Sequence, residues 1–71
     1  MRIITLTTDF GTRDEFTGVI KGVILKINPD ATIVDITHEI PAQAIEQAGE
    51  TLGAAFAWFP EGTIHMAVVR R

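Results

Sequence analysis

The sequence contains no cysteine, no serine and no tyrosine. Without cysteine the chain can form neither disulfides nor thiolate metal sites, and it has no cysteine nucleophile. Without serine, nucleophilic catalysis by a serine hydroxyl is excluded as well. The lack of disulfides fits a cytoplasmic protein, which is the location we expect.

Long apolar runs and an excess of basic charge are also missing. No stretch approaches the roughly 18 apolar residues that a membrane-spanning helix needs. A strand pattern begins directly after Met1-Arg2, which leaves no room for a signal peptide. Nine acidic and six basic residues give a net charge of −3, which disfavours nucleic acid as a partner. We therefore expect neither a membrane nor a nucleic acid among the partners.

Glycine-rich phosphate-binding motifs are absent too. Gly11 stands alone in the first predicted strand–helix turn, so this turn is neither a dinucleotide fingerprint nor a Walker A loop. Asp9-Phe10-Gly11 has the letters of the kinase magnesium motif, but nothing else of a kinase is present. A nucleotide ligand would have to be held in another way.

The two histidines do not form a recognisable metal motif. His38-Glu39 lacks the second histidine of the zinc-binding helix motif. Asp35, His38 and Glu39 could together bind a metal, but we favour hydrogen bonds of Asp35 and His38 within a strand–helix turn. His65 is predicted to pack inside a strand with its polar atoms satisfied. Trp58 and its neighbour Phe59 are expected in the core or in an interface.

What is present is typical of one small globular domain. The chain has 71 residues, of which 46% are hydrophobic and 21% charged. A chain of this length buries only about 60% of its unfolded surface, so its core is marginal.

Apolar periodicity predicts the order strand, helix, strand, helix, strand. The first strand ends at Asp9, and Asp14, a candidate cap, precedes a helix that stops at Asn28-Pro29-Asp30. Pro41 is expected in the first turn of the second helix. The apolar positions of the two helices are Phe16, Val19, Ile20, Val23, Ile24 and Ile27, and Ile45, Ala48, Leu52, Ala55, Phe56 and Phe59. The second and third strands cover 31–37 and 63–69.

This order predicts an α/β fold with a three-stranded parallel sheet, arranged βαβαβ as in one half of a Rossmann-like domain. The order of the strands in the sheet stays open. The third strand reaches the ligand edge of the sheet and the chain ends two residues later, so we expect a truncated piece or a subunit that needs a partner.

Asp9 is the residue around which a binding site is expected. In open α/β sheets, ligands bind beyond the carboxyl ends of the strands, where Asp9 would lie. The alternative is a turn or cap residue, because Asp commonly bonds to its local backbone in such turns.

Four stretches, in order and in register, resemble the S-adenosylmethionine (SAM) hydroxide adenosyltransferase family, which includes SAM hydrolases, fluorinase and chlorinase. They are Ile4–Thr12, Lys21–Ile24 with Ile27–Asp30, Ile33–Pro41, and Phe59–His65. The resemblance identifies residues 1–71 as the N-terminal portion of the family's α/β domain, with the C-terminal domain absent.

The resemblance implies a reaction and a site. Family members displace methionine from the ribose 5′ carbon of SAM with hydroxide, giving adenosine, or with a halide ion. They are trimers, with the ligand between the N-terminal domain of one subunit and the C-terminal domain of the next. The implied substrate-binding residues are Asp9, which would bond the ribose hydroxyls, Phe10, Asp14 and Gln43. Gln43 corresponds to a pocket tryptophan of the fluorinase, and Asp14 is equally explained as a helix cap.

One departure from the family bears on catalysis. In the hydrolases the third strand runs into an Asp-Pro-Gly-Val-Gly loop, whose Asp acts on the water together with a later Arg and His. Here Val69 is followed by Arg70-Arg71. We therefore assign no catalytic residue, no metal ligand and no cofactor, with SAM as the substrate.

Two functional hypotheses follow from different classes. The first is an N-terminal fragment of a SAM hydrolase, which carries part of the adenosine site and is inactive alone. The second is a non-enzymatic remnant that self-associates through exposed sheet and helix surfaces. A flavodoxin-like module unrelated to the family ranks last, because a fold alone does not define a function.

Overall fold

The computed structural model describes residues 2–12, 14–41 and 43–70. Its elements are, in chain order, β1 (Arg2–Thr8), α1 (Phe16–Ile27), β2 (Ala31–Thr37), α2 (Ile45–Phe56) and β3 (Ile64–Val68). The predicted alternation of strands and helices is confirmed.

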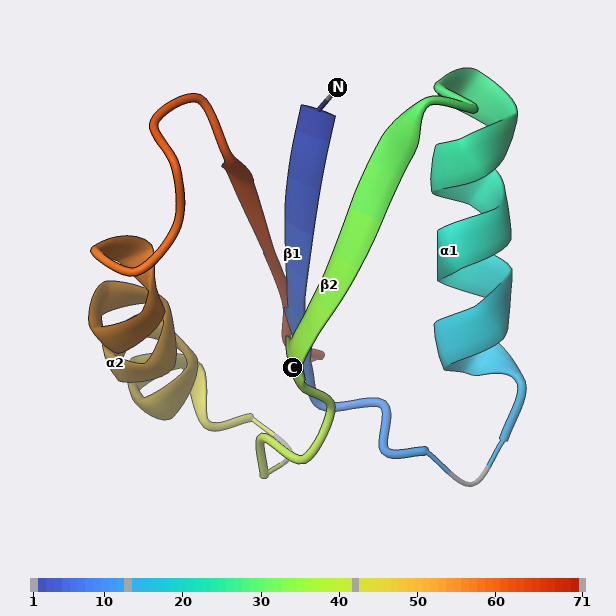
Figure 1. Ribbon diagram of the computed structural model, residues 1–71. Helices are drawn as coiled ribbons and strands as arrows, with labels where there is room; N and C mark the ends of the chain where they lie inside the picture. Colours follow the sequence, from blue (N-terminus) through green and yellow to red (C-terminus); the bar gives the residue numbers. More distant parts are fainter. Residues whose placement is uncertain (1, 13, 42, 71) are drawn as a thin grey trace.

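The three strands form one parallel sheet in the order β2-β1-β3. The two helices lie on opposite sides of this sheet (Figure 1). This is the expected βαβαβ fold, with each helix on a crossover between parallel strands. All three carboxyl ends meet at the lower edge of the sheet in Figure 1, which is the edge where ligands bind in such folds.

The central strand β1 supplies most of the core. Ile4 and Leu6 are buried and pack with Ile24 of α1. Leu6 is completely buried, which stabilises the fold by about 1.5–3 kcal/mol relative to an exposed side chain. The threonines of the same strand, Thr5, Thr7 and Thr8, are also completely buried, because α1 and α2 cover both faces of the sheet at β1.

Helix α1 begins one residue later than a cap at Asp14 would require. The N-cap residue is Glu15, which makes no side-chain cap bond. Asp14 still accepts a hydrogen bond from the Phe16 N–H, at 3.2 Å, and so satisfies one free donor of the first turn. The helix ends at Ile27, with Asn28 as its C-cap just before Pro29, as predicted.

Helix α2 begins four residues after Pro41, so the prediction of Pro41 in its first turn is wrong. A separate contact follows Pro41, because the Ala44 N–H donates to the Pro41 carbonyl at 3.0 Å. Gln43 has a φ of +66°, which no right-handed helix can include. Phe59 lies beyond the end of the helix, which comes at Phe56.

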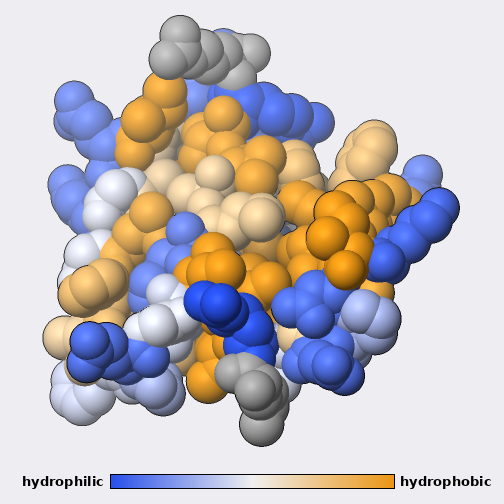
Figure 2. Space-filling model, turned by 90° about the horizontal axis from the view of Figure 1, so that it is seen from above, coloured by the Kyte–Doolittle hydropathy of each residue, from blue (hydrophilic) through white to orange (hydrophobic). Residues whose placement is uncertain are grey.

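The apolar stripe of α1 is only partly covered. Ile24 is buried, whereas Phe16, Val19 and Val23, which belong to the same apolar period, are 50–55% exposed. A sheet of three strands is too narrow to cover the whole stripe. Trp58 is 86% exposed, so it does not belong to the core. Figure 2 views the end of the molecule where the strands begin, and it shows hydrophobic surface across the middle of that end.

Candidate functional site

The candidate site is the turn that follows β1. Asp9 continues the strand pairing, because its N–H donates to the Val68 carbonyl at 3.2 Å. Its side chain is completely buried. The turn then reverses at Gly11, whose φ of +72° is readily reached only by glycine. Asp9 therefore lies at the carboxyl edge of the sheet, where the sequence predicts it.

Arg70 covers the Asp9 carboxylate. Asp9 Oδ2 accepts the backbone N–H of Arg70 at 2.9 Å, and Oδ1 lies 3.4 Å from Arg70 Nε. The Arg70 guanidinium also lies 5.5 Å from the centre of the Phe10 ring, within cation–π range. The Arg70 side chain is 60% exposed, so its contact is open to competition from a ligand. Arg71, the next residue, lies outside the described residues.

A bulge in β2 brings His38 to the same turn. The pairing of β1 with β2 shifts between Leu6 and Thr7, so that Thr7 pairs with Thr37 and Ile36 is the extra residue. The shift places His38 beside Thr8 and on the same face as Asp35. His38 Nδ1 lies 2.7 Å from Thr8 Oγ1, and Nε2 lies 2.8 Å from Asp35 Oδ1. The expected hydrogen bond between Asp35 and His38 is confirmed.

Asp35 joins this arrangement to helix α1. Lys21 Nζ donates to Asp35 Oδ2 at 2.7 Å. The Lys21 hydrogen bond has the largest effect and lowers the pKa of the Asp35 carboxyl below its usual value. Burial of the carboxyl opposes this effect, and the His38 hydrogen bond lowers the pKa by a smaller amount. Thr8, His38, Asp35 and Lys21 thus form a continuous hydrogen-bond network, which we call the Thr8–His38 network.

The same turn is tied to the β2–α2 loop through its backbone. The Gly11 N–H donates to the His38 carbonyl at 2.7 Å, and the Ile40 N–H donates to the Thr8 carbonyl at 3.2 Å. The Thr8 hydroxyl accepts a bond from the Phe10 N–H at 3.2 Å. His38 and Ile40 are both buried. The position of Asp9 is therefore defined by contacts from three strand ends.

Asp14 and Gln43 lie in the two loops at this edge of the sheet. Asp14 belongs to the β1–α1 loop and Gln43 to the β2–α2 loop, and both are exposed. Gln43 lines an open pocket of about 700 Å³ along the start of α2, with Glu46, Gln47 and Glu50 among its other lining residues. Their roles as substrate contacts stay predictions.

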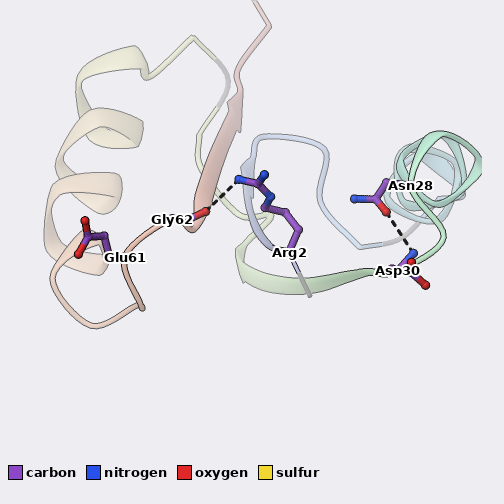
Figure 3. A pocket seen from close by; sticks show the side chains of 5 residues that line it. All are labelled: Arg2, Asn28, Asp30, Glu61 and Gly62. Atoms are coloured by element: carbon purple, nitrogen blue, oxygen red, sulfur yellow. Dashed lines mark hydrogen bonds between the residues drawn. The ribbon is translucent and has the colours of Figure 1, made fainter.

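The opposite edge of the sheet holds a different pocket, of about 420 Å³ (Figure 3). Its lining residues are Arg2, Asn28, Asp30, Glu61 and Gly62. Arg2 Nη1 donates to the Gly62 carbonyl at 3.4 Å, and the Asp30 N–H donates to Asn28 Oδ1 at 3.2 Å. The Arg2 and Asn28 side chains therefore already bond to nearby parts of the fold, and this edge is not the ligand edge of a parallel sheet.

Two further findings concern the described residues. No group of three or more histidine, cysteine, aspartate or glutamate side chains among them is close enough to hold a metal ion. Over the same residues, neither helix has the length and apolar character needed to cross a membrane.

His65 of β3 is packed and hydrogen-bonded, as predicted. Its Nδ1 lies 2.8 Å from Thr5 Oγ1. Its ring lies between Phe56 and Phe59, with centroids 5.5 Å and 5.7 Å away. His65 belongs to the face of the sheet that α2 covers, not to the candidate site.

Together these features define a class of protein, a parallel α/β unit with an aspartate at the end of its central strand. Residues 4–71 match the sequence model of the SAM hydroxide adenosyltransferase N-terminal domain. The chain belongs to this family, as the sequence motifs indicate.

Individual relatives support the same assignment. The chain is 46% identical to the (R)-S-adenosyl-L-methionine hydrolase of Methanocaldococcus jannaschii, over 94% of this chain and 27% of the relative. It is 36% identical to a fluorinase of an Actinoplanes species, over 87% of this chain and 21% of the relative. The chain thus spans about a quarter of the length of these curated relatives.

Solved structures show the same fold. An uncharacterized conserved protein from Thermotoga maritima superposes with a TM-score of 0.89 at 41% identity, over 93% of this chain and 25% of that chain. A conserved hypothetical protein from Thermus thermophilus superposes with a TM-score of 0.85 at 36% identity, over 97% of this chain and 29% of that chain.

Sequence reasoning missed three partners in the site: Thr8, Lys21 and Arg70. Thr8 meets His38 only because of the bulge in β2. Arg70 meets Asp9 across 61 positions of sequence. The one signal available was the predicted parallel sheet, which brings the ends of the first and third strands to one edge.

Proposed function

We propose that this chain carries the ribose-contacting part of the adenosine site of a SAM hydrolase. The observation that carries the proposal is the position of Asp9 at the carboxyl end of the central strand. A carboxylate accepts hydrogen bonds from two neighbouring hydroxyls, as a ribose 2′,3′-diol presents them. The relatives named SAM hydrolase and fluorinase support SAM as the substrate of the whole protein.

The proposal covers binding and not catalysis by this chain. In a complete hydrolase, water would displace methionine from the ribose 5′ carbon and leave adenosine. No residue of this chain is assigned to position or deprotonate that water. Contacts that hold the ribose equally in the ground state and the transition state lower no barrier. We therefore expect adenosine binding without measurable hydrolysis of SAM, with Phe10, Asp14 and Gln43 as the further contacts.

A thermal melt by circular dichroism, with and without adenosine, tests the proposal. At a hundredfold excess over its dissociation constant, a ligand of the folded state stabilises by about 2.7 kcal/mol. For a domain of this size that corresponds to a rise in Tm of roughly 10–20 °C.

The matched control ligand is 2′,3′-dideoxyadenosine, which keeps the base but lacks the 2′ and 3′ hydroxyls of the ribose. It should shift the Tm far less than adenosine. Asp9→Ala should reduce the adenosine shift to the level of the control ligand. Equal shifts for the two nucleosides would show that no ribose diol is bound, and would reject the proposal.

The exposed apolar residues favour a second candidate function, self-association without catalysis. Ile27 and Trp58 are 81% and 86% exposed, and Phe56 is 68% exposed. Exposed apolar patches of this kind are typical of interaction sites. The dependence of oligomeric state on concentration tests this candidate.

A further inference from the structure

We propose that the Thr8–His38 network is a positioning device, which holds the Phe10 N–H and so orients Asp9 toward its ligand. The effect on ligand binding rests on the proposed function, whereas the effect on the turn does not. Thr8 and His38 touch no ligand in this proposal, because both are buried and they act through the backbone of the turn.

The hydrogen bonds of the network have defined donors and acceptors. The Asp35 carboxylate only accepts hydrogen bonds, so His38 Nε2 must carry the proton that bonds Asp35 Oδ1. When the imidazole carries only this proton, Nδ1 is an acceptor and the Thr8 hydroxyl donates to it. This leaves a lone pair of Thr8 Oγ1 free to accept the Phe10 N–H. With the proton on Nε2, every donor in the series has an acceptor.

The arrangement superficially resembles a hydroxyl–histidine–carboxylate catalytic triad. The Thr8 side chain, however, is completely buried, so no substrate carbon can approach its oxygen. The hydroxyl instead bonds the backbone two residues further on, beside Asp9. Positioning of the turn is therefore the role that the geometry allows.

The opposite face of the same strand supplies a matched control. Thr5 is as buried as Thr8 and makes the same type of bond, from Oγ1 to the Nδ1 of His65, at 2.8 Å against 2.7 Å for Thr8 and His38. Thr5 lies in the middle of β1 and bonds no residue of the turn through its side chain. Thr5→Val and Thr8→Val thus remove equivalent bonds, and only the second removes a bond to the turn.

The first readout is amide hydrogen exchange at Phe10, measured by NMR without ligand. Each rate is divided by that of the Asn28 amide, which bonds the Ile24 carbonyl at the far end of α1 and corrects for overall stability. Thr8→Val should speed the normalised exchange about two- to tenfold, the range set by the net strength of one hydrogen bond. Thr5→Val and Thr8→Ser should leave it unchanged. Equal rates in Thr8→Val and Thr5→Val would overturn the proposal.

Two further readouts keep the test decisive if Thr8→Val does not fold. The nitrogen chemical shifts of His38 in the parent chain should show a proton on Nε2, and an Nε2 without a proton would overturn the proposal, because the bond to Asp35 would then be absent. His38→Gln retains an amide near the Nε2 position for Asp35 but loses the Thr8 bond, so it should also speed Phe10 exchange. Unchanged Phe10 exchange in a folded His38→Gln would overturn the proposal.

Adenosine titration then separates the two proposals. If the parent binds adenosine, Thr8→Val should weaken binding by a larger factor than Thr5→Val, and equal factors would overturn the positioning role. If the parent does not bind adenosine, the proposed function fails, while Phe10 exchange still decides whether the network positions the turn.

Discussion

Arg70 competes with any ligand that uses the Asp9 carboxylate. Its Nε lies 3.4 Å from Oδ1 and its backbone N–H bonds Oδ2, so both oxygens already have partners. A ribose diol would have to take over at least the contact with Nε. The guanidinium is 60% exposed and its contact with the buried carboxylate is long, at 3.4 Å, so we take the contact to be worth about 1 kcal/mol, which is weak enough for a ligand to displace it.

We therefore expect Arg70→Ala to bind adenosine about two- to fivefold more tightly than the parent, which is the factor for the loss of a competing contact of that strength. Isothermal titration calorimetry measures the change. Arg2→Ala is the control, because Arg2 lies at the opposite edge of the sheet and bonds Gly62. Weaker binding by Arg70→Ala would mean that the guanidinium contacts the ligand and does not exclude it.

Individual contacts of the site were predictable from sequence only where they are local. The hydrogen bond between Asp35 and His38 spans three residues and follows from a polar strand–helix turn. The contact between Thr8 and His38 depends on one extra residue in β2, and apolar alternation in the sequence does not reveal that bulge. The candidate contacts of Asp9, Phe10, Asp14 and Gln43 with a substrate remain predictions.

At the scale of elements, Lys21 and Asp35 connect helix α1 to strand β2. The lowered pKa of Asp35 means that the folded state binds fewer protons than the unfolded state at pH values near 4. The resulting stabilisation is fully present above the unfolded-state pKa and is lost as the pH falls through the folded-state pKa. Both side chains are partly exposed, so solvent screening limits the effect to less than about 1 kcal/mol.

Lys21→Met should therefore lower the free energy of unfolding at pH 7 by less than about 1 kcal/mol. It should also flatten the loss of stability between pH 5 and pH 2, because Asp35 then titrates closer to its unfolded-state value. Urea unfolding at several pH values measures both effects. Lys26→Met removes the same charge five residues further along α1, and equal pH profiles for the two variants would contradict the prediction.

The elements themselves were largely predictable, because each has a clear apolar period and a clear stop. Asn28 and Pro29 end α1 where the sequence places its end. The start of α2 was misplaced, because proline suits a first helical turn and also an isolated turn. The left-handed φ of Gln43, which separates Pro41 from the helix, has no signature in the residue type.

At the scale of the whole molecule, the fold leaves large apolar side chains of both helices exposed. The apolar stripe of α1 is wider than the part of the sheet that it covers, and Val19 and Val23 are more than half exposed. The strand order β2-β1-β3 explains why these side chains stay exposed. Both helices pack over the region of the central strand, and the sheet extends only one strand to either side of it. The order of strands was not predictable, since the crossovers allow more than one arrangement.

The second candidate function predicts that the parent chain self-associates, and the exposed stripe of α1 is one of the surfaces that it would use. A standard interface buries about 800 Å² on each partner, roughly a sixth of the 4953 Å² surface of the chain. Sedimentation velocity should then show oligomers that increase with concentration. The double variant Val19→Gln/Val23→Gln should shift the population toward monomer, because it makes the exposed stripe of α1 polar. Ala54→Gln, at an exposed position of α2, should sediment like the parent.

A parent chain that is monomeric at every concentration would contradict self-association, and the adenosine site would then be the only function proposed for this fold.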